Sequence, residues 1–95
     1  MQTLDIDTTI QLGPRVRWRA VGAEGVLVHL EQGRVLVLDT VGLFAIERLA
    51  NPLSRHALAV AIANEFEVST EQAEVDLDGF LAQLDAEQVL ERRAA

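Results

Sequence analysis

The sequence contains no cysteine. Disulfide bonds, thiolate metal ligands and cysteine nucleophiles are therefore excluded, and this absence suits a reducing compartment. No apolar run approaches the roughly 18 residues that a membrane-spanning helix needs, and the first residues lack the basic and apolar stretches of a signal peptide. We therefore expect a cytoplasmic protein that does not enter a membrane.

Basic residues are also scarce. The chain has 8 Lys and Arg residues against 15 Asp and Glu residues, which gives a formal net charge of −7. A field of this sign repels phosphate backbones. Nucleic acid is therefore not an expected partner.

Side chains suited to catalysis or metal binding are few. The histidines are His29 and His56, and neither has a partner at the spacing of a metal site. Ser54 and Ser69 stand where helix caps are expected, and the glycines do not form a phosphate-binding loop. Most acidic residues of the last predicted helix lie opposite its apolar stripe and suit a solvated face: Glu71, Glu74, Asp76, Asp78 and Asp85. We therefore expect no catalytic residue, no metal and no cofactor.

The chain has 95 residues, of which 49% are hydrophobic, and this suits one domain with a compact core. Residues 1–13 are polar and acidic and predict a flexible N-terminal arm. We expect the folded domain over residues 14–90 and a solvated C-terminal tail over residues 91–95.

Three strands are predicted in the first half of this domain. Arg15–Arg19 alternates arginine with apolar residues, which is the period of a half-buried strand. The turn Gly22–Gly25 leads to the apolar strand Val26–Leu30. The loop Glu31–Gly33 then leads to a third strand, Arg34–Leu38. Because the loops are short, the strands should pair as an antiparallel sheet.

Helical spacing of apolar residues follows the third strand. Asp39 or Thr40 can cap the first predicted helix, and Ser54 and Ser69 can cap the next two. The predicted helices are Val41–Ala50, Arg55–Phe66 and Thr70–Asp85. The order predicts an α+β fold of the winged helix-turn-helix type, with a three-stranded antiparallel sheet followed by three helices.

A winged-helix outline often indicates DNA binding, but the last helix argues against it here. As a recognition helix it would present Glu74, Asp78, Gln83 and Asp85 to the major groove. The carboxylates of this face would meet phosphate repulsion with no basic residue to offset it. The fold outline therefore does not carry a DNA-binding function.

An ordered set of segments is similar to the PqqD-like family, the small domains also called RiPP precursor peptide recognition elements. The set is Pro14–Val16, Val26–Val28, Gly33, Val37–Gly42, then Leu58, Ile62, Phe66, Asp76–Leu77, Phe80–Leu81, Leu84 and Val89–Leu90. PQQ-pathway members usually have an Asp-Gly turn after the first helix, where this chain has Asn51-Pro52. The run Asp39–Gly42 is more similar to recognition elements of lasso-peptide pathways.

The resemblance implies a non-catalytic adaptor for natural-product biosynthesis. In the family, the leader region of a ribosomally synthesised precursor peptide adds as a strand to the edge of the third strand, beside the third helix. The partners implied are this leader peptide and a modifying enzyme, such as a radical SAM enzyme, a cyclase or a leader peptidase. On this chain the predicted peptide-binding residues are Arg34, Val35, Leu36, Val37, Leu38, Val75, Asp78, Gly79 and Ala82.

Other interpretations remain open at this point. One is a homo-oligomeric structural or regulatory winged-helix domain that binds no peptide, including a homodimer formed through the same strand edge. Another is a peptide chaperone of PQQ biosynthesis. Arg15, Arg17 and Arg19 either meet an acidic leader or form a solvated strand face, and the alternation favours Trp18 as a core residue over a ligand-stacking one.

Overall fold

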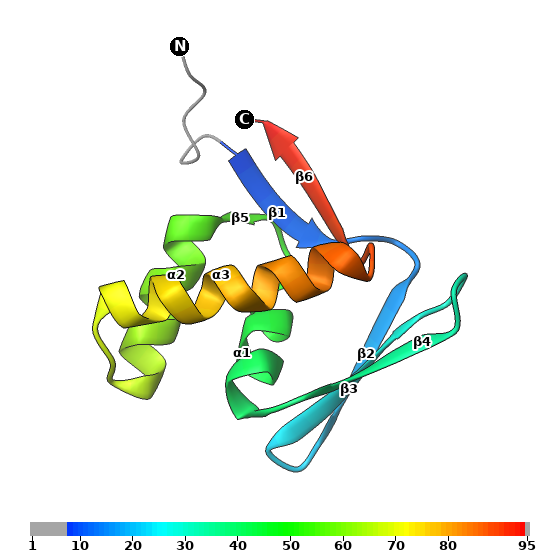
Figure 1. Ribbon diagram of the computed structural model, residues 1–95, viewed down its shortest axis with the longest axis horizontal. Helices are drawn as coiled ribbons and strands as arrows, with labels where there is room; N and C mark the ends of the chain where they lie inside the picture. Colours follow the sequence, from blue (N-terminus) through cyan, green and yellow to red (C-terminus); the bar gives the residue numbers. More distant parts are fainter. Residues whose placement is uncertain (1–7, 95) are drawn as a thin grey trace.

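The computed structural model describes residues 8–94, which form two small antiparallel sheets and three helices (Figure 1). One sheet consists of β2 (Val16–Val21), β3 (Glu24–His29) and β4 (Arg34–Leu38), paired in that order. The predicted α+β fold, with a three-stranded antiparallel sheet followed by three helices, is confirmed.

The hairpin between β2 and β3 sets the register of this sheet. Val21 pairs with Glu24 across a two-residue loop, and Gly22 has a φ of +64° in its first position. Glycine accepts this left-handed conformation without a Cβ clash, as a tight hairpin turn requires. The register then places alternate residues on opposite faces, so that Leu27 faces the core and Val26 the outside.

Each helix begins at a side-chain cap predicted from the sequence. Asp39 accepts a hydrogen bond from the Gly42 N–H at 2.7 Å, Ser54 from Ala57 and Ser69 from Gln72, the last two at 3.0 Å. These bonds satisfy N–H groups that have no partner within the helix. The helices are α1 (Thr40–Leu49), α2 (Arg55–Phe66) and α3 (Thr70–Ala86).

Helix α1 is the centre of the core. Five consecutive residues, Gly42 to Ile46, are buried, so that more than one face of the helix is covered. It contacts β3 on one side and α2 and β1 on others. The fully buried larger side chains come from β3, the three helices and the segment after α3: Leu27, Ile46, Leu49, Leu58, Leu77, Leu84 and Val89.

A second sheet was not predicted from the sequence. It is formed by β5 (Leu53–Ser54), β1 (Thr8–Leu12) and β6 (Leu90–Ala94), with β1 in the middle, at the top of the view in Figure 1. The predicted flexible arm is therefore wrong for residues 8–12, because Ile10 is only 3% exposed and anchors β1 in the core. Residues 1–7 of that arm lie outside the described residues.

The predicted C-terminal tail likewise forms a strand rather than a free end. Residues 91–94 are exposed, as expected, but they pair with β1 in register from Leu12–Leu90 to Thr8–Ala94. The folded body thus extends beyond the expected limits of residues 14–90 in both directions.

Two glycines should respond oppositely to alanine. A methyl group on Gly25 would lie 2.8 Å from Leu43 Cδ1 and 3.2 Å from the Arg19 carbonyl oxygen, whereas one on Gly79 would meet nothing within 4 Å. We expect Gly25→Ala to lower the free energy of unfolding by about 1–3 kcal/mol through overpacking. Gly79→Ala, in an exposed helix interior, should raise it by about 0.5–1 kcal/mol. Urea unfolding measures both, and equal changes would contradict this packing.

Candidate functional site

Strand β4 has an open edge. It pairs with β3 on one side, and no strand of residues 8–94 pairs with its other side. The two residues that flank a two-residue hairpin loop exchange main-chain hydrogen bonds, and here they are Val21 and Glu24. Along β3, the main-chain groups of successive residues therefore point alternately toward β2 and toward β4. It follows that the main-chain N–H and C=O groups of Val35 and Val37 point to the open edge of β4.

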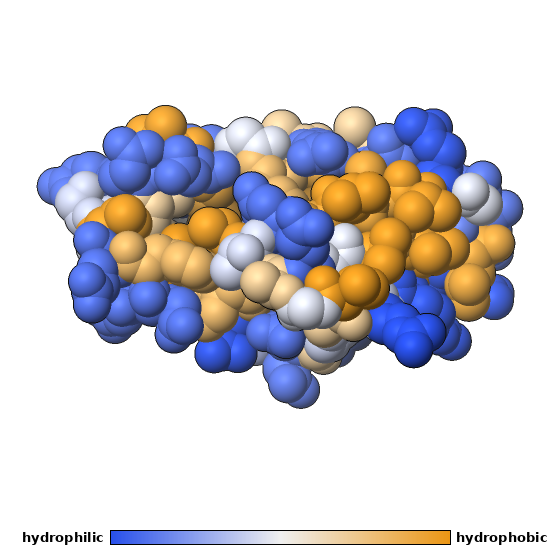
Figure 2. All heavy atoms as spheres, turned by 90° about the horizontal axis from the view of Figure 1, so that it is seen from below, coloured by the Kyte–Doolittle hydropathy of each residue, from blue (hydrophilic) through white to orange (hydrophobic). Residues whose placement is uncertain are grey.

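The side chains of β4 divide between the two faces of the sheet. Leu36 and Leu38 face the core and are largely covered. Val35 and Val37 face outward and are 58% and 77% exposed. Figure 2 shows apolar side chains gathered over the half of the molecule that holds β2, β3 and β4.

A hollow lies between the end of β4 and α3. We call it the β4 hollow; its volume is about 270 Å³, and it is lined by Glu24, Val37, Leu38, Asp39, Phe80 and Gln83. It places apolar side chains directly beside the open edge. A chain that paired with β4 would therefore lie next to this hollow.

A second hollow continues from the first along α3. This α1 hollow has a volume of about 200 Å³ and is lined by Asp39, Val41, Gly42, Ala45, Ile62, Asp76, Leu77 and Phe80. Both hollows share Asp39 and Phe80, so they lie side by side between β4 and the start of α1, and we call the two together the groove.

The other end of α3 is tied to the hairpin between β3 and β4. Arg34 Nη2 lies 2.9 Å from Glu87 Oε2, and the Gln32 amide donates to Gln88 Oε1 at 2.8 Å. These contacts hold the C-terminal end of α3 beside the start of β4. Gln88 has a φ of +59°, so its backbone adopts a conformation that favours glycine.

The structure brings only part of the predicted site together. The five predicted residues Arg34 to Leu38 make up the open strand. Val75, Gly79 and Ala82 lie on an exposed row of α3, and Asp78 faces Arg55. None of these four lines the groove.

The sequence analysis missed the row of α3 that does line the groove. Asp76, Phe80 and Gln83 contribute to the two hollows, and Glu87, one turn further, meets Arg34. Their spacing of four, three and four residues is that of one helix face. This row lies next to the buried stripe of α3. Its position beside that stripe is the feature of the sequence from which the groove-lining residues could have been predicted.

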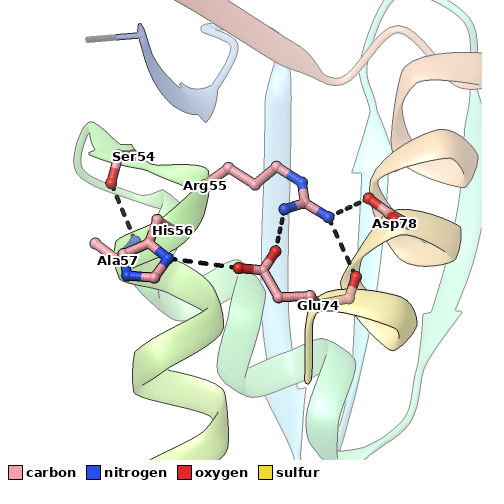
Figure 3. A network of polar contacts seen from close by, with 6 residues as sticks. All are labelled: Ser54, Arg55, His56, Ala57, Glu74 and Asp78. Carbon is pink, nitrogen blue, oxygen red and sulfur yellow. Dashed lines mark hydrogen bonds and ion pairs between the residues drawn. The ribbon is translucent and has the colours of Figure 1, made fainter. Parts of the chain in front are cut away.

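On the opposite side of α3 an ion-pair cluster joins the helix to α2 (Figure 3). Arg55, the first residue of α2, donates to the carboxylates of Glu74 and Asp78 and, at 3.1 Å, to the Glu74 carbonyl oxygen. His56 Nδ1 lies 3.4 Å from the same Glu74 carboxylate. Burial alone would lower the pKa of Arg55, but the hydrogen bonds and negative charges of Glu74 and Asp78 outweigh it and raise that pKa. The pairing with Arg55 explains the position of the Asp78 side chain, so no ligand is needed to explain it.

The arginines of β2 form a solvent-facing row. Arg17 and Arg19 lie on the outer face, where the register sets them beside Val28 and Val26. Arg15 precedes the strand and lies 3.5 Å from Glu31. Trp18 points to the other face and packs, half-buried, against the core.

Across residues 8–94, no three His, Cys, Asp or Glu side chains gather in a way that could hold a metal ion. None of the helices in this part of the chain combines the length and hydropathy needed to span a bilayer.

The Arg55 cluster should stabilise the fold measurably. Its side chain is 30% exposed, so we expect Arg55→Gln to lower the free energy of unfolding by about 1 kcal/mol. The matched control is Arg15→Gln, which breaks a pair whose partners are both 63% exposed and should cost about 0.5 kcal/mol or less. Thermal and urea unfolding compare the two variants. Equal losses would show that the cluster adds nothing beyond an exposed ion pair.

Comparison with known proteins agrees with this architecture. The structure of TbiB1 in complex with the TbiA(beta) leader peptide has 30% sequence identity and a TM-score of 0.74, covering 85% of this chain and 94% of that chain. The PqqD truncation of Methylobacterium extorquens PqqCD, a stand-alone RiPP recognition element, has 22% identity and a TM-score of 0.71, covering 87% of this chain and 88% of that one.

Among curated proteins no match is found. The family model described as coenzyme PQQ synthesis protein D (PqqD) matches residues 24–90, which include β3, β4 and all three helices. This match confirms the resemblance drawn from the sequence. The chain therefore belongs to the PqqD family.

Proposed function

We propose that this chain binds the leader segment of a ribosomally synthesised precursor peptide and holds it for a separate modifying enzyme. The observation that carries the proposal is the open edge of β4 beside a groove along α3. TbiB1, the 30% identical protein with the same fold, has been seen in complex with a leader peptide. Such a chain is a non-catalytic adaptor, and the absence of cysteine suits its work in the cytoplasm.

An extended peptide would bind by adding a strand to β4. The main-chain groups of Val35 and Val37 would give affinity whatever the peptide sequence, because every residue except proline offers the same N–H and C=O groups. Alternate side chains of the peptide would point into the β4 hollow, where Leu38, Phe80 and Gln83 would select among them. One added strand buries a modest area, below about 1,200 Å², so the complex should be transient.

The outer face of the sheet is our candidate surface for the modifying enzyme, whether a radical SAM enzyme, a cyclase or a leader peptidase. Val35 and Val37 are exposed there and pair with Val28 and Val26, and the arginines of β2 stand beside them. This face is apolar and basic in a chain of net charge −7. A partner surface that is apolar and bordered by carboxylates would complement it.

Self-association through the same edge is the alternative. Two copies could pair β4 with β4, because the main-chain groups of an open edge accept any extended partner. A leader that binds this edge would then break up the dimer. Sedimentation with and without leader peptide separates a peptide-binding edge from a permanent dimer contact.

Val37→Pro tests the binding edge. It removes the N–H that points to the open side and leaves the hydrogen bonds to β3 in place, so the fold should persist. We expect the affinity for a leader peptide to fall by about tenfold or more, through the lost hydrogen bond and the bulk of the ring at the edge. The probes are the labelled leader of a precursor encoded beside this chain's gene and the TbiA(beta) leader, measured by fluorescence anisotropy.

The matched control is Val37→Ala, which keeps the N–H and truncates a side chain that is 77% exposed at the rim of the β4 hollow. Its affinity should stay within about threefold of the wild type, because the main-chain bond persists. Unchanged binding by a folded Val37→Pro variant would place the site elsewhere.

Arg19→Glu tests the outer face. The substitution reverses a charge beside Val26 without touching the open edge, so leader affinity should not change. Conversion of the full precursor by its enzyme should fall about fivefold or more, because reversing a rim charge lowers the association rate. Arg93→Glu makes the same charge change on β6, in the other sheet, and should leave conversion unaffected. Equal conversion by both variants would remove the outer face as the docking surface.

A further inference from the structure

The groove carries charge of one sign. Glu24 and Asp39 line the β4 hollow, and Asp39 and Asp76 line the α1 hollow. In the part of the chain that the structure describes, no arginine or histidine lines either hollow. The arginine of β4, Arg34, is held by Glu87 at 2.9 Å.

The two carboxylates of the α1 hollow have no basic partner among residues 8–94. Arginines pair elsewhere with Glu31, Glu74, Asp78, Asp85 and Glu87. Over residues 8–94, neither Asp39 nor Asp76 forms a salt bridge. Each accepts a hydrogen bond from an uncharged donor, the Gly42 N–H at 2.7 Å and the Gln72 amide at 2.9 Å. Neither carboxylate is therefore neutralised by an arginine of the described residues, and both can still pair with a cation from outside.

Between these carboxylates the floor of the hollow is apolar. Ala45, Ile62 and Leu77 are at most 4% exposed, and the half-buried ring of Phe80 forms one wall. An apolar floor with carboxylates at the rim fits a side chain that has an aliphatic stem and a cationic end. Arginine and lysine have this form, and either cation is also attracted to an aromatic face.

The position of the α1 hollow indicates which part of a bound peptide would reach it. Asp39 follows β4 directly, and the α1 hollow lies beyond that end of the strand. A peptide paired with β4 would cross the β4 hollow first. A residue just outside the paired segment would then lie over the α1 hollow.

We propose that the α1 hollow holds an arginine or lysine side chain of the leader, from a residue next to the segment that pairs with β4. Its stem lies on Ala45, Ile62 and Leu77, and its charge lies between Asp39 and Asp76. The proposal rests on the leader-binding function and adds the charge requirement of the leader to it. The selected leader is thus basic at this point, and an acidic residue there is rejected by like charge.

The test pairs leader variants with protein variants. In a leader that binds the wild-type protein, each Arg and Lys is replaced in turn by Gln. We expect one replacement to weaken binding to the wild type by about three- to fivefold, the range of a partly exposed ion pair. Asp76→Asn should weaken the parent leader equally and should remove the effect of that one replacement. Intermolecular NOEs from the same leader residue to the Phe80 ring should locate it.

Asp78→Asn is the matched control. It removes the same charge from the same helix two residues away, but on the side that faces Arg55. The effect of the leader replacement should persist in this variant. Thermal unfolding of both variants checks that Asp76→Asn leaves the fold intact, as expected for an exposed residue.

Two results would overturn the proposal while leader binding stands. One is a leader whose basic residues can all be replaced without coupling to Asp76, although Val37→Pro still weakens its binding. The other is a leader in which leucine replaces the basic residue without loss of affinity, which would make the hollow an apolar site. If no leader binds the wild type, or if Val37→Pro binds normally, the proposed function fails instead.

Discussion

The hydrogen bond from the Gly42 N–H to the Asp39 carboxylate is the constraint around which the rest of the structure is arranged. It ends β4 and starts α1 within one residue, so the edge strand is joined directly to the buried central helix. A Cβ on Gly42 would lie 3.2 Å from that carboxylate and 3.3 Å from Phe80, which shows how closely α3 approaches the junction. The same carboxylate lines both hollows of the groove. A local cap thus sets both the core and the candidate site.

Helix α3 performs three tasks with three rows of side chains. One row, with Leu77 and Leu84, is buried in the core. A second, with Glu74 and Asp78, is tied to Arg55 at the start of α2. The third, with Phe80 among its members, lines the groove. The contacts of the second row restrain the rotation of the helix, and the third row lies beside β4 in this orientation.

Features that depend on residues close together in the sequence could be predicted from it, and features that depend on distant residues could not. The ends of the three helices were predicted to within one residue. They depend on caps such as Ser54 and Ser69, whose hydrogen-bond partners lie only three residues away. The second sheet depends on Leu12 pairing with Leu90, and the charged residues 91–93 hide the alternation of β6. On α3, one residue is a rotation of about 100°. Choosing Val75 and Gly79 in place of Asp76 and Phe80 therefore turned the predicted site out of the groove.

The distribution of arginine explains why the groove remains acidic. The 8 basic residues are all arginines: Arg15, Arg17, Arg19, Arg34, Arg48, Arg55, Arg92 and Arg93. Four pair with carboxylates, at the Glu31 loop, at the start of β4 and on the side of α3 away from the groove, where Asp85 raises the pKa of Arg92 by hydrogen bonding. Arg48 stacks 4.3 Å from the centre of the Phe44 ring, and Arg17 and Arg19 lie on the outer face of the sheet. Because structural contacts and the outer face hold most of the arginines, and none lines either hollow, Asp39 and Asp76 are among the carboxylates of the described residues that have no arginine beside them. The outer face of the sheet thus carries arginines and the groove carries carboxylates, so the two surfaces that we propose for the enzyme and the peptide differ in charge.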